Sequence, residues 1–225
     1  MDDLVITVYE LATLLVPFLV AYAVVRTIAS RTGRTTAGLL PGLVFAFYVF
    51  AVLYVTGVGT VYDLADMANG TPRLPNQVNV VPFAGGITMG TVLNAVMFVP
   101  LGFLLPLMWR RGARLAPVVG FGFAFSLAIE LTQLLNNRTT DIDDLLMNTL
   151  GALVGFVLFK LWERLTTSRE RTSRHAAYPG NLYSGQRALL PGLAEPALYL
   201  AVMFVGHFLL FNGMGIAVLL YNLAH

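Results

Sequence analysis

Long apolar runs separated by short polar segments dominate the chain. Six of these runs are long enough for helices that cross the hydrocarbon core of a bilayer, which takes about 20 residues per helix. They cover residues 4–25, 37–61, 87–109, 115–135, 145–161 and 193–220. The pattern predicts an all-α fold class, a polytopic α-helical membrane bundle with six transmembrane helices, organised as a single integral membrane domain over residues 1–225.

The composition excludes an ordinary soluble domain. Only 12% of the 225 residues are charged, whereas 57% are hydrophobic, and the mean hydropathy is +0.73. Soluble domains carry about twice that charged fraction, and a chain of this size cannot hide so much apolar surface from water. The absence of cysteine further excludes disulfide scaffolds and cysteine-ligated metals.

Basic and acidic residues separate by loop. All but two of the 14 Lys and Arg residues lie in the first, third and fifth connections between the runs, the exceptions being Arg73 and Arg138. Because basic residues in short loops stay in the cytoplasm, we expect a multi-pass protein of the plasma membrane with both termini extracytoplasmic. Residues 162–192 are predicted to form a flexible basic cytoplasmic loop near membrane lipids. Charge confined to short loops does not indicate a nucleic-acid partner.

Small residues four positions apart recur in or beside the predicted spans. The pairs are Gly38/Gly42, Gly86/Gly90, Gly120/Ala124 and Gly151/Gly155. Such pairs let helix backbones approach closely in lipid, so we expect close helix packing at these positions.

Polar side chains fall at similar depths in several predicted spans, where they are costly and therefore candidates for function. The fourth span carries Ser126, Glu130 and Gln133 on one face, and the start of the fifth span repeats such a stripe. A short turn joins the two spans, so we expect an outward-facing polar pocket in which Arg138 reaches one or more carboxylates. The candidate ligand-binding residues are Asn79, Phe83, Asn94, Ser126, Glu130, Gln133, Arg138, Asp141, Asp143, Asp144 and Asn148.

Helix capping is a simpler explanation for part of the acidic run. Thr140, Asp141 and Asp143 suit a helix start, where side-chain oxygens accept from free backbone N–H groups. Capping does not account for Glu130 below the surface. Carboxylates are also ligands for Mg²⁺ or Ca²⁺, so Asp141, Asp143, Asp144 and Glu130 form a candidate metal site, although the pattern is not specific and requires no cofactor.

Four ordered motifs resemble a known family. They are N-V-V-P-F from Asn79, N-A-V-M-F-V-P-L-G from Asn94, S-L-A-I-E-L-T-Q from Ser126 and R-T-T-D-I-D-D-L-L-M-N-T-L-G from Arg138. Together they resemble the VanZ-like membrane proteins over residues 79–155, with a shorter interval than is usual between the first two motifs. The resemblance implies a small polytopic protein with a link to the cell envelope. The family's namesake is associated with resistance to the lipoglycopeptide teicoplanin, and no settled reaction comes with the family.

Three functions compete. In the first, which we favour, the protein is not an enzyme and its pocket binds an amphiphile, either a lipid-linked envelope intermediate or a lipoglycopeptide. Pro82 and Phe83 then form a lid, or else only a solvated loop. The second is a divalent-cation-dependent enzyme acting on a lipid phosphate at the outer leaflet, although no nucleophile elbow or phosphate loop is present. The third is a small ion or proton-coupled transporter that uses Glu10, Glu130 and His207.

Overall fold

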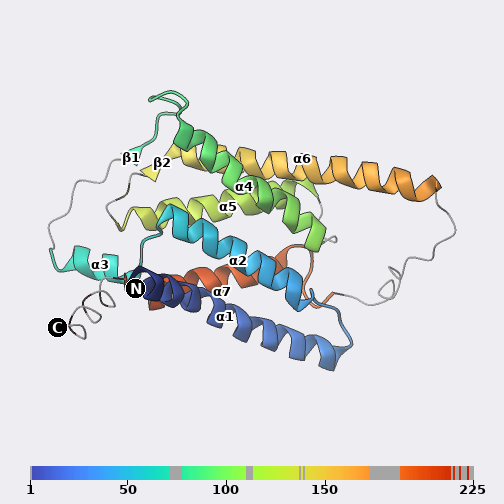
Figure 1. Cartoon of the computed structure of the whole chain (residues 1–225), viewed down its shortest axis with the longest axis horizontal. Helices are drawn as coiled ribbons and strands as arrows, with labels where there is room; N and C mark the ends of the chain where they lie inside the picture. The colour runs from blue at the N-terminus through green and yellow to red at the C-terminus, as the bar shows by residue number, and fades with distance from the viewer. Residues whose placement is uncertain are drawn as a thin grey trace.

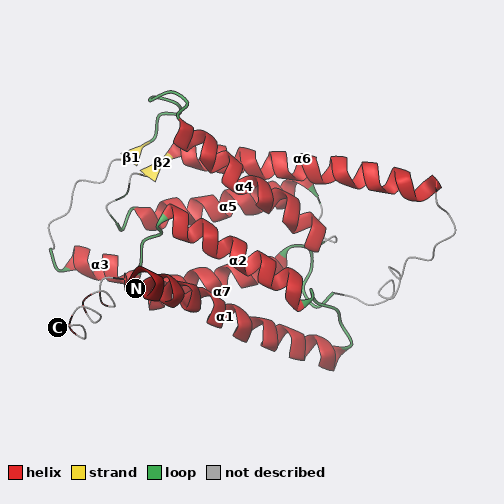
Figure 2. Cartoon of the chain, in the orientation of Figure 1, coloured by secondary structure: helices red, strands yellow, loops and turns green. Residues whose placement is uncertain are grey.

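The computed structural model describes residues 2–70, 78–109, 114–136, 138, 140–172, 188–213, 215, 218 and 222. In this part of the chain the named helices are α1 (Asp2–Thr32), α2 (Leu39–Thr56), α3 (Val61–Ala68), α4 (Met89–Met108), α5 (Leu115–Gln133), α6 (Ile142–Thr172) and α7 (Ala194–Leu210). Two short strands, β1 (Val78–Asn79) and β2 (Thr140–Asp141), pair in parallel at one end of the helices (Figures 1 and 2).

The predicted all-α membrane bundle is confirmed. Within the described residues, five helical stretches are long and apolar enough to cross a membrane, namely Leu4–Thr32, Leu39–Ala68, Met89–Met108, Leu115–Gln133 and Ile142–Thr166. The sixth predicted span corresponds to α7, which has 17 residues. A helix of that length rises about 25 Å, near the lower limit for crossing a bilayer core.

The helices form two groups. α4, α5 and α6 lie toward the top of Figure 1, and the most extensive contact is that between α4 and α6. α1 packs mainly against α7, with α2 beside them. α2 also joins the groups, because the Tyr48 hydroxyl donates to the Met97 carbonyl oxygen of α4 at 3.0 Å. The rings of Phe45 on α2 and Trp109, the residue after α4, add an edge-on contact with centroids 5.4 Å apart.

Glycines bring α4 and α6 very close together. A Cβ atom placed on Gly151 would lie 2.0 Å from the Ala95 carbonyl oxygen, and one on Gly155 would lie 2.0 Å from the Val99 carbonyl oxygen. The close packing expected at this pair of small residues is confirmed. At Gly120, in contrast, no described atom lies within 4 Å of the Cβ position, apart from the local helix backbone. Not every small-residue pair therefore marks a helix contact.

α2 ends earlier than predicted. It stops at Thr56, because Gly57 adopts a left-handed φ of 62° and ends the helix. A separate helix, α3, was not predicted from the hydropathy, which is continuous through this region. It begins at a capping box in which the Asp63 carboxylate accepts from the Thr60 backbone N–H at 2.7 Å.

α6 continues beyond its predicted end at residue 161. It reaches Thr172 and so rises about 46 Å, which is longer than a bilayer core. Trp162 supports the extension by packing against Phe103 of α4, with ring centroids 6.0 Å apart. The first part of the predicted flexible loop 162–192 is therefore helical, and residues 173–187 lie outside the described residues.

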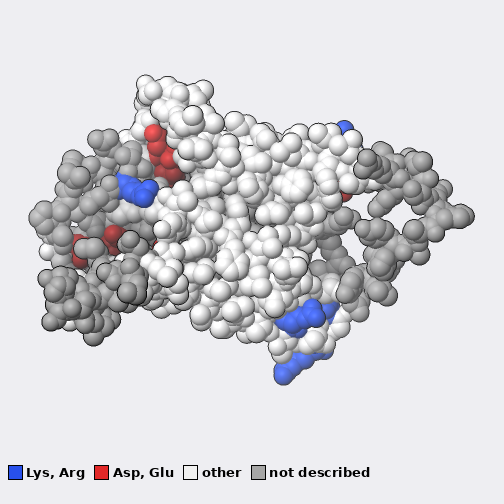
Figure 3. Space-filling model, viewed as in Figure 1, with Lys and Arg blue, Asp and Glu red and all other residues white. Residues whose placement is uncertain are grey.

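The two ends of the bundle differ in charge (Figure 3). The acidic end, where α1 begins and α5 ends, carries Asp63, Asp66, Asp141, Asp143 and Asp144, together with Arg138. The basic end, where α1 ends and α5 begins, carries Arg26, Arg31, Arg34, Arg114, Lys160 and Arg164. A hydrogen bond from the Tyr9 hydroxyl to the Leu210 carbonyl oxygen places the start of α1 beside the end of α7. The N-terminal end of α1 and the C-terminal end of α7 therefore lie at the same end of the bundle.

The orientation in the membrane is a prediction from the basic loops, and the absence of cysteine makes it testable. A cysteine replacing Arg138 should react with a membrane-impermeant maleimide on intact cells. A cysteine replacing Arg114 should react only after the cells are opened. The unmodified chain is the control for background labelling, and the reverse labelling pattern would invert the predicted orientation.

Candidate functional site

Polar side chains gather at the acidic end, where α4, α5 and α6 meet. The acidic cluster is defined here as Asn79, Asn94, Glu130, Asp141, Asp143 and Asp144. Its members come from β1, α4, α5, β2 and the first turn of α6. The short connection between α5 and β2 brings the end of one helix close to the start of the next, which is why the acids converge.

Glu130 and Asp141 connect α5 to the start of α6. The Glu130 carboxylate is 5% exposed and accepts from the Asp141 backbone N–H at 3.1 Å. Oδ1 of Asp141 accepts from the Asp143 backbone N–H at 2.9 Å and from Nδ2 of Asn79 at 3.1 Å. The pairing of β1 with β2 places Asn79 opposite Asp141. Part of the acidic run therefore orders backbone, as the capping explanation expects.

Asp143 anchors the segment that precedes α4. Its Oδ1 accepts from the Phe83 backbone N–H at 2.7 Å. Phe83 has a φ of 54°, a conformation that is rare for bulky side chains and persists only where the surroundings hold it. The segment around Pro82 and Phe83 is thus attached to the start of α6.

Asn94 and Asp144 form the accessible part of the acidic cluster. The Asn94 side chain hydrogen-bonds the Asp144 carboxylate, which links α4 to α6. Both side chains are partly exposed, whereas Glu130 and Asp143 are buried. A molecule that approaches this end therefore meets a carboxylate beside an amide, with further carboxylates beneath them.

Three predicted site residues hold helices together instead of joining the acidic cluster. Nδ2 of Asn148 donates to Oγ of Ser126 at 2.9 Å, in a buried contact between α6 and α5. Nε2 of Gln133 donates to the Thr56 carbonyl oxygen of α2 at 2.8 Å. Polar contacts of this kind stabilise helix packing in lipid. Their side chains are not part of the accessible face.

Arg138 does not pair with the carboxylates as we expected. Its guanidinium lies over Gly57, so that a Cβ atom on that glycine would be 2.6 Å from Nε of Arg138. In the described part of the chain no ion pair within 4.0 Å joins Arg138 to a carboxylate. The C-terminal end of α2 carries partial negative charge from its free carbonyl groups, which attracts a cation to this position.

The four carboxylates predicted as metal ligands are engaged mainly with backbone and amide groups. Among the described residues no three His, Asp or Glu side chains come together so that they could hold a metal ion. The Asp141 and Asp143 carboxylates accept instead from backbone and amide N–H groups. The hypothesis that Asp141, Asp143, Asp144 and Glu130 bind Mg²⁺ or Ca²⁺ therefore stays a prediction.

Another buried polar pair lies in the other group of helices. Oε1 of Glu10 is 3.7 Å from Nε2 of His207, between α1 and α7, and both side chains are buried. Glu130 is on α5, which packs on α4 and α6. These three residues, which we considered together as an ion or proton route, therefore belong to two separate sites.

Glu195 is a buried acid that is not among the predicted site residues. Its side chain is 3% exposed, and its Oε1 accepts from the Thr36 hydroxyl, the Ala37 backbone N–H and the Tyr199 hydroxyl. It also lines a cavity of about 720 Å³ at the basic end. The sequence signal for Glu195 is an acid at the start of an apolar run, which marks the first turn of a helix.

The fold and the acidic cluster define a multi-pass α-helical membrane protein with a polar site at one end of its α4–α6 unit. The chain belongs to the VanZ/LLP1 family, whose model matches residues 45–163, more than half of the sequence. It is similar to Protein VanZ of Enterococcus faecium, with 28% identity over 118 residues that cover 52% of this chain and 71% of that protein. No solved structure matches the chain.

Proposed function

We propose that this chain is a cell-envelope protein of the plasma membrane whose acidic cluster binds the head group of an amphiphile. The observation that supports this is the position of the partly exposed Asn94–Asp144 pair next to an apolar segment. In that segment Val80, Ile87 and Met89 are 71%, 70% and 75% exposed. Adjacent polar and apolar surfaces match a molecule that has a polar head and an apolar tail.

The charge of the acidic cluster selects the chemistry of the head group. Its carboxylates are acceptors, and within the described residues no Lys or Arg lies within 4.0 Å of them. Such a site favours hydroxyl, amide or ammonium donors and repels phosphate. This argues against an enzyme that acts on a lipid phosphate here, and it favours a binding protein.

The sugar and peptide parts of a lipid-linked envelope intermediate carry many donors, as does a lipoglycopeptide such as teicoplanin, and both molecules have an apolar tail. Membership of the VanZ/LLP1 family supports a link to resistance against such drugs. A protein that holds either molecule at the outer leaflet keeps the drug apart from the envelope intermediate. Binding alone would then lower susceptibility, without a chemical step.

Asp144→Asn tests the proposal, because it removes a charge at the accessible face and keeps the shape of the side chain. We expect binding of teicoplanin to the purified full-length protein to weaken at least about tenfold, since a hydrogen bond to a charged group contributes about 1.5–3 kcal/mol. Isothermal titration in detergent measures this. The minimum inhibitory concentration of teicoplanin for cells that express the variant should fall to that of cells without the protein.

Asp66→Asn is the matched control, because Asp66 is an exposed acid at the same end but outside the acidic cluster. It should bind and protect like the unmodified chain. Unchanged binding and resistance in both Asp144→Asn and Glu130→Gln, at normal expression, would contradict the proposal. So would an unmodified protein that binds neither teicoplanin nor a lipid-linked envelope intermediate.

A further inference from the structure

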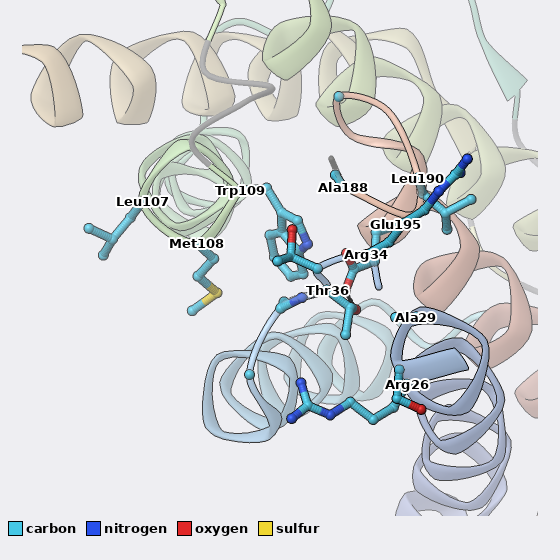
Figure 4. A pocket seen from close by; sticks show the side chains of 15 residues that line it. Arg26, Ala29, Arg34, Thr36, Leu107, Met108, Trp109, Ala188, Leu190 and Glu195 are labelled. Atoms are coloured by element: carbon cyan, nitrogen blue, oxygen red, sulfur yellow. Dashed lines mark hydrogen bonds between the residues drawn. The ribbon is translucent and has the colours of Figure 1, made fainter. Parts of the chain in front are cut away.

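A cavity of about 720 Å³ opens at the basic end, far from the acidic cluster. Its walls come from the end of α1, the link between α1 and α2, the last turn of α4 and the residues before α7 (Figure 4). Cavities of this volume hold small-molecule ligands in many proteins. None of the functions considered above uses this cavity.

Two arginines contribute positive charge to the lining of the cavity. Arg26 and Arg34 both line it, and Figure 4 shows their side chains extending on different sides of the group. Gly38, the residue before the first turn of α2, lines the cavity, and it has no side chain to cap that helix end. The free N–H groups and the dipole of a helix start attract anions, so the arginines and α2 favour the same kind of ligand.

Trp109 adds an unused hydrogen-bond donor. Its side chain is 7% exposed and lines the cavity. Its indole Nε1–H has no hydrogen-bond partner among the described residues. In Figure 4 the ring points from the end of α4 toward the centre of the group, near Thr36. A buried donor without an acceptor is unfavourable, and a ligand oxygen in the cavity would supply the acceptor.

Glu195 is the one acid among the residues that line the described cavity, and its Oε1 is already engaged by three donors. Its effect is to fix the start of α2 against α7. The Leu189 backbone N–H donates to the Thr35 carbonyl oxygen at 3.0 Å, and Nη1 of Arg34 approaches the Leu189 carbonyl oxygen at 3.5 Å. The wall that carries Arg34 is therefore held in place without a ligand.

We infer that this cavity binds a phosphate group, carried by an anionic membrane lipid or free in solution. The start of α2 and the Trp109 N–H provide donors for the phosphate oxygens, and Arg26 and Arg34 add positive charge on two sides of the cavity. Leu107, Met108 and Leu190 form apolar walls beside them, suited to the glycerol and first acyl carbons of a lipid. The charge distribution predicts that this end faces the cytoplasm, where the leaflet is rich in anionic lipids.

Tryptophan fluorescence provides the test, because the chain has only two tryptophans. The full-length Trp162→Phe protein, in which Trp109 is the single fluorophore, is reconstituted in phosphatidylcholine vesicles. Brominated phosphatidic acid and brominated phosphatidylcholine are then compared as quenchers at equal fractions, and inorganic phosphate is titrated separately. We expect stronger quenching by the anionic lipid if a lipid supplies the phosphate, and a saturable response to inorganic phosphate if the free ion does.

Variants of the two arginines test whether such a response comes from the cavity. Arg26→Gln and Arg34→Gln should each weaken the binding of the anionic lipid or of inorganic phosphate about fivefold. The double variant should weaken it about 25-fold. Arg31→Gln is the matched control, because Arg31 is an exposed residue of α1 that does not line the cavity. Equal quenching by both lipids with no response to phosphate would overturn the inference. A loss in Arg31→Gln as large as that in Arg26→Gln would overturn it as well.

Discussion

Gly155→Leu is expected to prevent α4 from packing against α6, with loss of most of the folded protein. A Cβ atom at this position would lie 2.0 Å from the Val99 carbonyl oxygen and 2.9 Å from the Cα of Gly102. Both are backbone atoms, so no side-chain rotation relieves the overlap and the helices must separate. In hydrocarbon, close packing is the main force between helices, so its loss is severe. The loss of folding free energy exceeds the value of about 1–3 kcal/mol that is typical of overpacking.

Size-exclusion chromatography of a fluorescent fusion in detergent measures the effect, as loss of the monodisperse peak. Gly120→Leu is the matched control, a glycine of α5 with no described atom within 4 Å of its Cβ position apart from the local helix backbone. It should elute like the unmodified chain, because leucine is also the better helix former. A Gly155→Leu protein with a normal peak and a normal melting temperature would show that α4 and α6 do not pack this closely.

Glu195→Ala is expected to lower the melting temperature by about 6–12 °C. The substitution leaves the Thr36 hydroxyl, the Ala37 N–H and the Tyr199 hydroxyl without their acceptor in a buried site. Each unsatisfied donor costs about 1 kcal/mol or more, and about 3 kcal/mol corresponds to this shift for a chain of roughly 225 residues. Circular dichroism during heating in detergent is the measurement.

Glu195→Gln separates the hydrogen bonds from the volume of the side chain, because it keeps a carbonyl oxygen in the position of Oε1. Its melting temperature should fall by less than half as much. Equal melting temperatures for the alanine and glutamine variants would show that the three donors do not depend on this acceptor. The result also bears on the cavity at the basic end, whose wall Glu195 holds in place.

The two ends of the molecule present opposite chemistry. At the acidic end, carboxylates beside exposed apolar side chains favour donor-rich head groups. At the basic end, a cavity lined by Arg26 and Arg34 favours phosphate. The ligands proposed for the two sites therefore differ, and variants at one end leave the other unchanged. Asp144→Asn and Arg26→Gln can be compared in both assays for that reason.

Some of the contacts at the acidic end were predictable from the sequence. Glu130 and Asp141 were expected to approach because a short turn joins their helices, and the backbone N–H of Asp141 donates to Glu130. The motifs that resemble VanZ-like proteins also marked the region in which Asn94 meets Asp144. Close packing at Gly151 and Gly155 followed from their spacing. The short turn limits how far apart Glu130 and Asp141 can be, whereas the spacing of Gly151 and Gly155 predicts a helix contact without identifying the partner helix.

Other contacts between distant segments were not predictable from the sequence. Arg138 was expected on the carboxylates but lies over Gly57, because the left-handed turn after α2 places a helix C-terminus within its reach. Glu10 was considered together with Glu130 as part of one proton route, but it faces His207 in the other group of helices. Depth in a membrane follows from position in a span, whereas the direction in which a side chain points follows from packing.

Hydropathy and loop charge alone are sufficient to predict a helical membrane bundle with an acidic and a basic end, because lipid and water sort residues one by one. They do not predict that α4 packs on α6, that α1 packs on α7 or that Glu195 joins the start of α2 to α7. Those arrangements depend on the fit between surfaces of helices far apart in the chain, and many apolar pairings are nearly equal in lipid. The cavity at the basic end is a product of that packing, and so only the tertiary structure reveals it.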